Sequence, residues 1–250
     1  MIGVAIGAAL AVIATGVGVT LALHSGGKKT TESKRPVASP SPSQTTNQPQ
    51  GDTPNSSGGD VQPVVAGWQV VEHGSLNVAF DVPKDWTVEP AQATVSFNGA
   101  DGFPAVMAGG VAEYKPNYCS KGNTVGVAGT RPVDDAKNLQ DAAVTSAEDW
   151  VYYGFTDPTS KQHGTLKYTP AAPFSNQHGI TGYAAEATAS DVPKANQCTT
   201  DGAAYTVAWL GDDGKPVVAV ILTNTTGPEQ VSPQTITTVE GSLRRIHSAS

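Results

Sequence analysis

The sequence predicts an α+β domain in which helices pack on an antiparallel sheet. From residue 67 onward, many short segments are rich in β-branched and aromatic residues or alternate apolar and polar residues, as strands do. Two further segments, 139–151 and 236–246, repeat apolar residues at helical spacing. An apolar run at residues 2–23 and a polar stretch precede the domain. The predicted fold class is therefore an antiparallel sheet with packed helices, preceded by one transmembrane helix and a disordered linker.

The apolar run is long enough to cross a membrane. Its 22 residues carry no charge and would span about 33 Å as a helix, which matches a hydrocarbon core. A buried core helix is seldom this long. A cleaved signal peptide would have a shorter apolar region and a clean A-x-A site, which residues 22–25 do not provide. We assign residues 1–24 to a transmembrane anchor or signal-anchor, and the sequence leaves its cleavage open.

The charges around this anchor conflict with export. Four basic residues follow the apolar run and none precedes it: Lys28, Lys29, Lys34 and Arg35. The positive-inside rule alone would keep the following chain in the cytoplasm. The polar linker and the two cysteines favour export instead, and the abrupt start at Met1 leads us to expect a basic segment upstream. We predict a single-pass cell-membrane protein with its C-terminal domain outside the cytoplasm.

Residues 25–66 are predicted to be a disordered linker. They are mainly Ser, Thr, Pro, Gln, Gly and Asn, with too few apolar side chains to offset the entropy of ordering. The globular domain then spans residues 67–250, with 11 basic and 19 acidic residues. A domain this acidic repels phosphate backbones, so we expect no nucleic-acid partner.

The strands are predicted in order along the domain. Residues 76–82 alternate strictly, and their apolar members share one face. The other strand-like runs are bounded by Gly, Pro, Asn and Asp; they are 68–73, 86–89, 94–97, 106–114, 124–133, 165–169, 180–188, 204–210 and 216–223. Residues 211–215 join the last two runs as a hairpin loop.

Two amphipathic helices complete the predicted domain. We expect Asp134 or Asp135 to cap the first, and Ser232 with Pro233 to open the second. The predicted buried stripe of the first is Leu139, Ala143, Ala147, Trp150 and Val151, and that of the second is Ile236, Val239, Leu243 and Ile246. Arg244 and Arg245 would stand in the last turn of the second helix, where cations favour the helix dipole.

Parts of this domain resemble PsbP-like domains. Residues 80–86, Phe-Asp-Val-Pro-Lys-Asp-Trp, are similar to the VP-x-x-W opening of that family, and residues 236–246 resemble its closing helix. The layout of anchor, linker and domain resembles a group of uncharacterised actinobacterial membrane-anchored envelope proteins. The resemblance implies an α/β/α sandwich and no activity, because proteins of that fold are mostly accessory or binding proteins. The glycine-rich stretch 108–129 departs from the compact core expected there.

Cys119 and Cys198 are the strongest candidate pair of functional side chains. Both lie in polar loops, and two is an even number for an exported domain. The C-x-x-C spacing of a redox pair is absent. We predict a structural disulfide, with two free thiols or a redox pair as the alternatives.

No catalytic or metal-binding motif stands out. No histidine has another at i+2 to i+4, and nucleophile-elbow, phosphate-loop and calcium-loop motifs are absent. We therefore expect no catalytic residue, no metal and no cofactor. Tyr152 and Tyr153 cannot both share the buried face of the first helix, so they are a candidate interaction surface. The alternative is that they only cover the edge of the core.

The leading functional hypothesis is a non-catalytic binding or accessory module of the cell envelope. Its partner would be a protein, a lipid or a wall glycan, and the sequence leaves the oligomeric state open. One alternative is an envelope hydrolase with an unrecognised Ser/His/Asp site, which predicts a pocket converging on His73, His163 or His178. The other is a structural surface protein, which predicts neither a pocket nor an exposed apolar patch.

Overall fold

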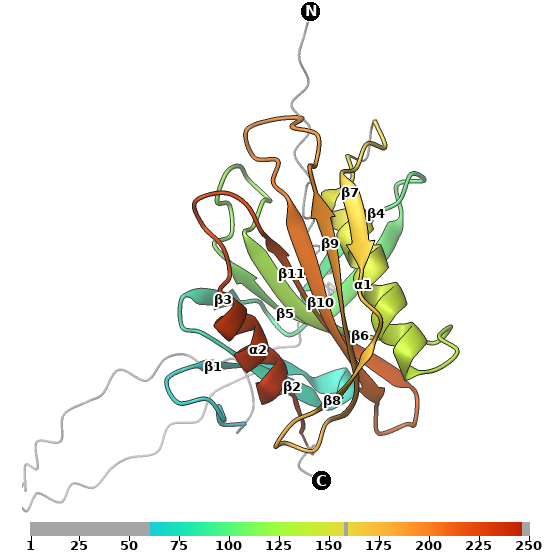
Figure 1. Cartoon of the computed structure of the whole chain (residues 1–250). Coiled ribbons are helices and arrows are strands. Elements are labelled where there is room, and N and C mark those ends of the chain that lie inside the picture. Colours follow the sequence, from blue (N-terminus) through green and yellow to red (C-terminus); the bar gives the residue numbers. More distant parts are fainter. Residues whose placement is uncertain (1–60, 158–159, 247–250) are drawn as a thin grey trace, which may run out of the picture. The chain divides into compact units, whose positions relative to one another are not determined.

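The computed structural model describes residues 61–157 and 160–246, so the predicted anchor and most of the predicted linker lie outside the described residues. The elements in this part are shown in Figure 1. The strands are β1 (Gln69–His73), β2 (Val78–Val82), β3 (Trp86–Val88), β4 (Thr94–Asn98), β5 (Pro104–Tyr114), β6 (Gly126–Pro132), β7 (Thr165–Tyr168), β8 (Ala172–Ser175), β9 (Thr181–Ser190), β10 (Gly202–Leu210), β11 (Pro216–Asn224) and β12 (Arg244–Arg245). The helices are α1 (Leu139–Phe155), α2 (Pro233–Ser242) and a short 3-10 turn, η1 (Gly74–Leu76). None of the helices described is long and apolar enough to span a bilayer.

A nine-stranded antiparallel sheet forms the centre of the domain. Its order is β3-β5-β6-β11-β10-β9-β7, with β4 added to β5 and β8 added to β9. The predicted hairpin of β10 and β11 is confirmed and pairs residues from Gly202↔Asn224 to Leu210↔Pro216. A separate three-stranded sheet holds β1, β2 and β12.

Both faces of the central sheet are buried. On β11, Val218 and Val220 point into a core shared with α1, whereas Val217 and Ile221 point into a second core shared with α2, β1 and β2. A strand that is buried on both faces has a nearly continuous run of apolar residues in its sequence, and residues 216–223 show this pattern. In Figure 1, α1 lies along one face of the sheet and α2 lies on the other. The expected α/β/α sandwich is therefore modified, because a small sheet joins α2 on its side.

The first helix begins later than predicted. Asn138 is its N-cap, with an extended backbone and a side-chain oxygen that accepts a hydrogen bond from the Asp141 N–H at 2.9 Å. The prediction of Asp134 or Asp135 as the cap is wrong, and Asp134 instead pairs with Lys215 at 3.0 Å. The predicted stripe is confirmed, since four of its members are buried and Leu139 packs against them.

The second helix opens as predicted but ends early. Ser232 caps it by accepting a hydrogen bond from the Thr235 N–H at 3.0 Å, and Pro233 occupies its first turn. Arg244 and Arg245, which were expected in its last turn, form β12 and pair with β2 instead. The predicted placement of both arginines and of Ile246 in the helix is therefore wrong.

Asp81 on β2 explains why the chain leaves the helix there. Its buried carboxylate makes an ion pair with Arg244, at 2.9 Å between Oδ1 and Nη2. Its other oxygen, Oδ2, accepts hydrogen bonds from the N–H groups of Val64 and Val65 at 2.7 and 2.8 Å. A buried carboxylate requires such partners, so it fixes both ends of the domain on β2. The ordered domain consequently begins upstream of Gly67, the predicted boundary.

Candidate functional site

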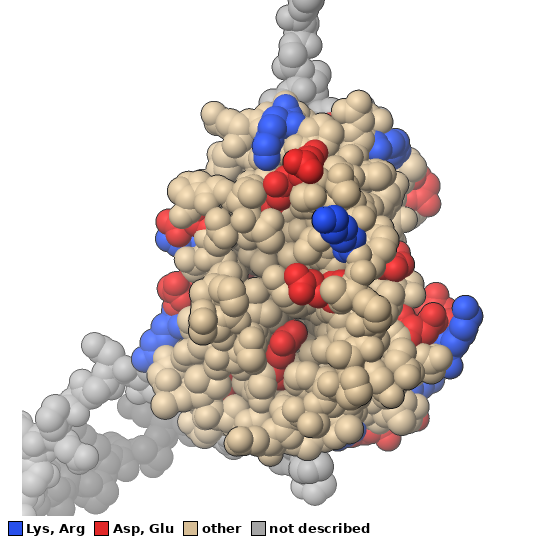
Figure 2. Space-filling view, viewed as in Figure 1, with Lys and Arg blue, Asp and Glu red and all other residues tan. Residues whose placement is uncertain are grey.

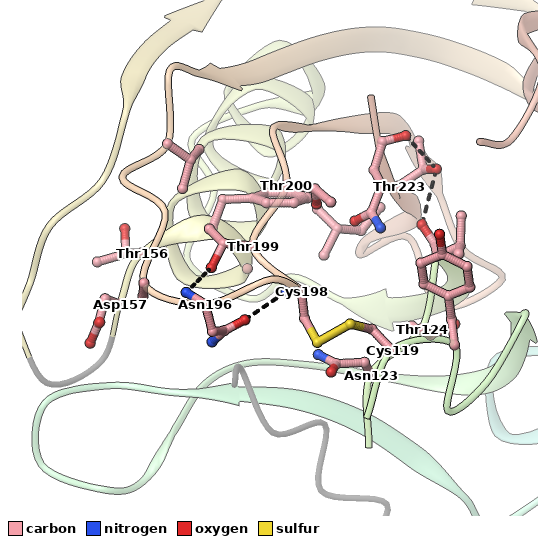
Figure 3. Close-up of a pocket in the computed structure, with 18 of the residues that line it drawn as sticks. Cys119, Asn123, Thr124, Thr156, Asp157, Asn196, Cys198, Thr199, Thr200 and Thr223 are labelled. Atoms are coloured by element: carbon pink, nitrogen blue, oxygen red, sulfur yellow. Dashed lines mark hydrogen bonds between the residues drawn. A yellow bond between two sulfur atoms is a disulfide. The ribbon is translucent and has the colours of Figure 1, made fainter. Parts of the chain in front are cut away.

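A cavity of about 110 Å³ lies where the C-terminal end of α1 meets two loops, 115–125 and 192–200. Its remaining lining comes from the ends of β4 and β11, the start of β6, and Gln162 between α1 and β7. Figure 3 shows the labelled side chains around it, with Thr156 and Asp157 on one side and Thr124 on the other. We call it the threonine pocket, after the five threonines that line it: Thr124, Thr156, Thr199, Thr200 and Thr223.

The predicted disulfide is confirmed and forms part of the pocket wall. Cys119 and Cys198 are bonded, with their Cα atoms 5.6 Å apart, and both line the cavity (Figure 3). The Cys198 N–H donates to Asn196 Oδ1 at 2.8 Å, and the Asn196 N–H donates to Thr199 Oγ1 at 3.3 Å. The disulfide and these local bonds hold the two loops that enclose the pocket.

Glycines allow the end of α1 to approach the sheet at the pocket. A Cβ on Gly154 would lie 2.8 Å from a methyl carbon of Leu222, and one on Gly202 would lie 1.7 Å from Cζ of Phe155. Such distances are too short for a real Cβ, so a side chain at either position would require Leu222 or Phe155 to move. Phe155 and Leu222 thereby become apolar lining of the pocket, together with Phe97, Val127 and Val192.

Thr156 stands out among the polar lining residues. Only 8% of it is exposed, and its hydroxyl has no hydrogen-bond partner among the described residues. Thr124 and Thr223 differ, because their hydroxyls donate to the carbonyls of Tyr114 at 2.6 Å and Val125 at 3.2 Å. A buried hydroxyl without a partner costs about 1–3 kcal/mol. The Thr156 hydroxyl is enclosed by protein atoms, so Thr156 forms part of the cavity wall without presenting its hydroxyl to the cavity.

The lining is almost uncharged. Asp157 is its one ionisable carboxylate, and no Lys, Arg or His belongs to the described lining. Asp157 Oδ1 accepts a hydrogen bond from the Ser160 N–H at 3.0 Å, which closes the turn after α1. The last turn of α1 has no basic residue, so the partial negative charge of its carbonyl groups is not offset there. The pocket thus presents neutral donors and acceptors beside a weakly negative end.

The histidines named by the hydrolase hypothesis do not line this pocket. His73 lies against Gly109 and Gly110, where a Cβ would come within 2.9 and 2.7 Å of it, and its Nδ1 is 2.7 Å from Thr130 Oγ1. Burial lowers the pKa of His73. The glycine-rich stretch 108–129 thus supplies β5 and β6 and makes room for this side chain.

The other two histidines lie at the surface. His163 Nδ1 is 2.8 Å from the Gly164 carbonyl oxygen, and its ring is tilted against Tyr152 at 5.6 Å between centroids. His178 is exposed in the loop before β9. The described residues also contain no group of three or more His, Cys, Asp or Glu side chains that could hold a metal ion.

Tyr152 and Tyr153 are both half-buried on α1 and do not line the pocket. Their rings meet edge to face at 5.0 Å between centroids, and Tyr153 packs against the core beneath the helix. Their role as an interaction surface stays a prediction.

Two pairs of carboxylates lie elsewhere in the domain. Burial, with repulsion from Glu186, raises the pKa of Glu240 to about 7. Burial, with repulsion from Glu89, raises the pKa of Glu113 to about 7. Burial and Glu186 also raise the pKa of Tyr205 to about 12. Figure 2 shows acidic side chains recessed in hollows on the face that carries α2.

The family model that matches this chain covers most of it, over residues 61–248. The chain belongs to the family defined by a domain of unknown function, DUF8017. The match begins at residue 61, where the described domain begins. No curated protein matches the chain.

The solved structures that are similar to this chain include a Mog1 protein and a PsbP. The Ran-binding protein Mog1p of Saccharomyces cerevisiae is 12% identical, with a TM-score of 0.35, over 72% of this chain and 95% of that chain. The cyanobacterial PsbP (CyanoP) of Synechocystis sp. PCC 6803 is 17% identical, with a TM-score of 0.38, over 77% of this chain and 99% of that chain. A PsbP is therefore among the structures similar to this chain, whereas the actinobacterial envelope group stays a prediction.

Sequence reasoning missed the threonine pocket. Its residues come from six separate segments, and no spacing in the sequence links them. One signal was present, because polar residues with hydroxyl and amide groups follow each cysteine: Asn123 and Thr124 after Cys119, and Thr199 and Thr200 after Cys198. A disulfide that joins two such loops brings those groups to one place.

Proposed function

We propose that this domain is a non-catalytic binding module of the cell envelope and that it takes a small ligand in the threonine pocket. One observation carries the proposal: a cavity of about 110 Å³ is lined by apolar side chains and by Thr200 and Asn224, whose side chains make no hydrogen bond among the described residues. A ligand that enters the cavity can therefore bond these polar groups while it covers the apolar walls.

The make-up of the pocket supports the same proposal. Small-molecule sites are concave and largely apolar, with a few placed polar groups that set orientation. Phe97, Phe155 and Leu222 supply apolar walls here, and threonine and amide side chains supply the polar groups. A single water molecule needs only about 10–15 Å³ of such space, so a cavity of about 110 Å³ has room for more than one water.

The location outside the cytoplasm rests on different features. The Cys119–Cys198 disulfide is typical of an oxidising compartment. The apolar run at residues 2–23 is suited to anchoring the chain in the cell membrane, and the polar residues after it are suited to a spacer. A domain held in this way would capture its ligand, or the exposed end of an envelope lipid, glycan or protein, close to the membrane.

A thermal-shift screen of the full-length chain against a library of small polar fragments tests the proposal. A ligand present at ten times its Kd stabilises the folded state by about 1.4 kcal/mol, which raises the Tm of a domain this size by about 3–6 °C. Ala195→Trp places a large side chain at the lining of the pocket and should abolish the shift. Ala105→Trp is the matched control, since Ala105 on β5 is also exposed but does not line the pocket. Hits that shift wild type and Ala195→Trp equally would overturn the proposal.

A further inference from the structure

We infer that the threonine pocket takes an uncharged, hydroxyl-rich ring compound about the size of a single sugar residue. This inference rests on the proposed function and names the chemical class of its ligand. It follows from the charge, hydrogen-bonding groups and shape of the lining.

The charge of the lining excludes anions. An anion entering the cavity would lose its hydration without meeting a Lys, Arg or His among the described lining residues. It would instead approach the Asp157 carboxylate and the negative end of α1. Phosphates, carboxylates and sulfates are therefore poor ligands for this site.

A cation is disfavoured for a different reason. The single carboxylate, Asp157, already accepts a hydrogen bond from the Ser160 N–H and is only partly buried. The other polar side chains of the described lining carry neutral hydroxyl and amide groups. An ammonium group placed among them would lose most of its hydration without an ion-pair partner.

The hydrogen-bonding groups match hydroxyls. A threonine hydroxyl both donates and accepts, and an asparagine side chain carries both a donor group and an acceptor. Thr200 and Asn224 line the pocket beside Thr156, and their side chains make no hydrogen bond among the described residues. Groups that can act either way are satisfied best by ligand hydroxyls, which also act either way.

The apolar walls of the pocket match the C–H faces of such a ligand. Phe97 and Phe155 present aromatic rings to the cavity, and Leu222 and Val192 present aliphatic groups. A sugar ring carries its hydroxyls around its edge and C–H groups on its faces. One neutral ring can therefore satisfy the threonines and cover the apolar wall together.

The test compares sugars that share one ring and differ in the charge of a single substituent. Glucose, glucuronate and glucosamine are titrated into the ¹⁵N-labelled full-length chain, and the methyl glycosides of mannose, galactose and N-acetylglucosamine extend the neutral set. The inference expects a neutral sugar to bind and to shift the amide signals of Thr156 and Thr200. An oligosaccharide ending in the same residue shows whether the source is a free sugar or a glycan end.

Variants locate the binding. Thr200→Val keeps the side-chain shape but removes a hydroxyl of the pocket lining, so affinity should fall about five- to tenfold. Thr87→Val, at an exposed position on β3, should leave affinity unchanged. Equal or tighter binding of glucuronate or glucosamine would overturn the inference, and so would shifts confined to another surface or no binding by any sugar. If sugars fail while a fragment binds in the pocket, the binding function stands and only the ligand class is wrong.

Discussion

Replacing Thr156 with valine should make the unliganded protein more stable. The Thr156 hydroxyl is buried and has no partner among the described residues. Valine has nearly the same shape, and the φ of −100° and ψ of 132° at this position suit a β-branched residue. The substitution therefore removes a desolvated polar atom and leaves the packing in place.

The size of the effect follows from the cost of the lone hydroxyl. A buried polar group without a partner costs about 1–3 kcal/mol, and valine recovers that cost. With a urea m-value of about 2 kcal/mol/M, the unfolding midpoint should rise by roughly 0.5–1.5 M at unchanged m.

Thr206→Val is the matched control for this measurement. Thr206 is only 1% exposed, but its hydroxyl donates to the Ala143 carbonyl at 2.8 Å. The same chemical change should therefore destabilise the protein, by about 1 kcal/mol. Urea unfolding followed by tryptophan fluorescence compares the two variants under one condition. A midpoint for Thr156→Val at or below that of wild type would refute the reasoning.

Three further substitutions or treatments test other parts of the structure. Reducing the Cys119–Cys198 disulfide should lower the free energy of unfolding by about 4 kcal/mol, because the disulfide closes a separation of 79 residues. Reduction should also abolish ligand binding. Urea unfolding with and without reductant measures the stability change. Gly202→Ala should destabilise by about 1–3 kcal/mol, since its Cβ would lie 1.7 Å from the Phe155 ring, and calorimetry should show a lower Tm. Protonated Glu240 should contribute stability that is fully present below pH 4.5, its ordinary pKa, and that is lost as pH rises through about 7. Glu240→Gln should therefore flatten the fall of the urea midpoint over that range.

Each of these three predictions has its own control or its own contradicting outcome. A reduced protein that unfolds at the same urea concentration and still binds its ligand would show that the disulfide does not hold the pocket. Gly74→Ala, where a Cβ meets nothing within 4 Å, should be nearly neutral, and an equal loss at both glycines would rule out the Phe155 clash. A wild-type midpoint that rises between pH 5 and pH 7 by more than that of Glu240→Gln would reverse the sign assigned to Glu240.

Much of the fold could be predicted because its signals are local. Strict alternation marked β2, the loop 211–215 marked the β10–β11 hairpin, and the Ser232-Pro233 pair marked the start of α2. The strand β8 was missed because Pro173 lies within it; proline is tolerated in edge positions such as this one but weakens the pattern of a strand.

The errors arose where distant contacts decide the structure. The helical spacing of residues 236–246 predicted that Arg244 would stay in the helix, but its ion pair with Asp81 draws it into β12. Asp81 itself lies in an apolar strand, and its partners are far away in sequence. The threonine pocket was out of reach for the same reason, since Thr156 shows its lack of a partner only after the chain has folded.

A crystal structure of the protein soaked with its tightest-binding neutral sugar tests the central claim most directly. We predict electron density for the sugar in the threonine pocket, with a ligand hydroxyl within hydrogen-bond distance of Thr200 Oγ1 and a ring face against Phe155. Density at another surface, with the pocket filled by protein side chains, would contradict it.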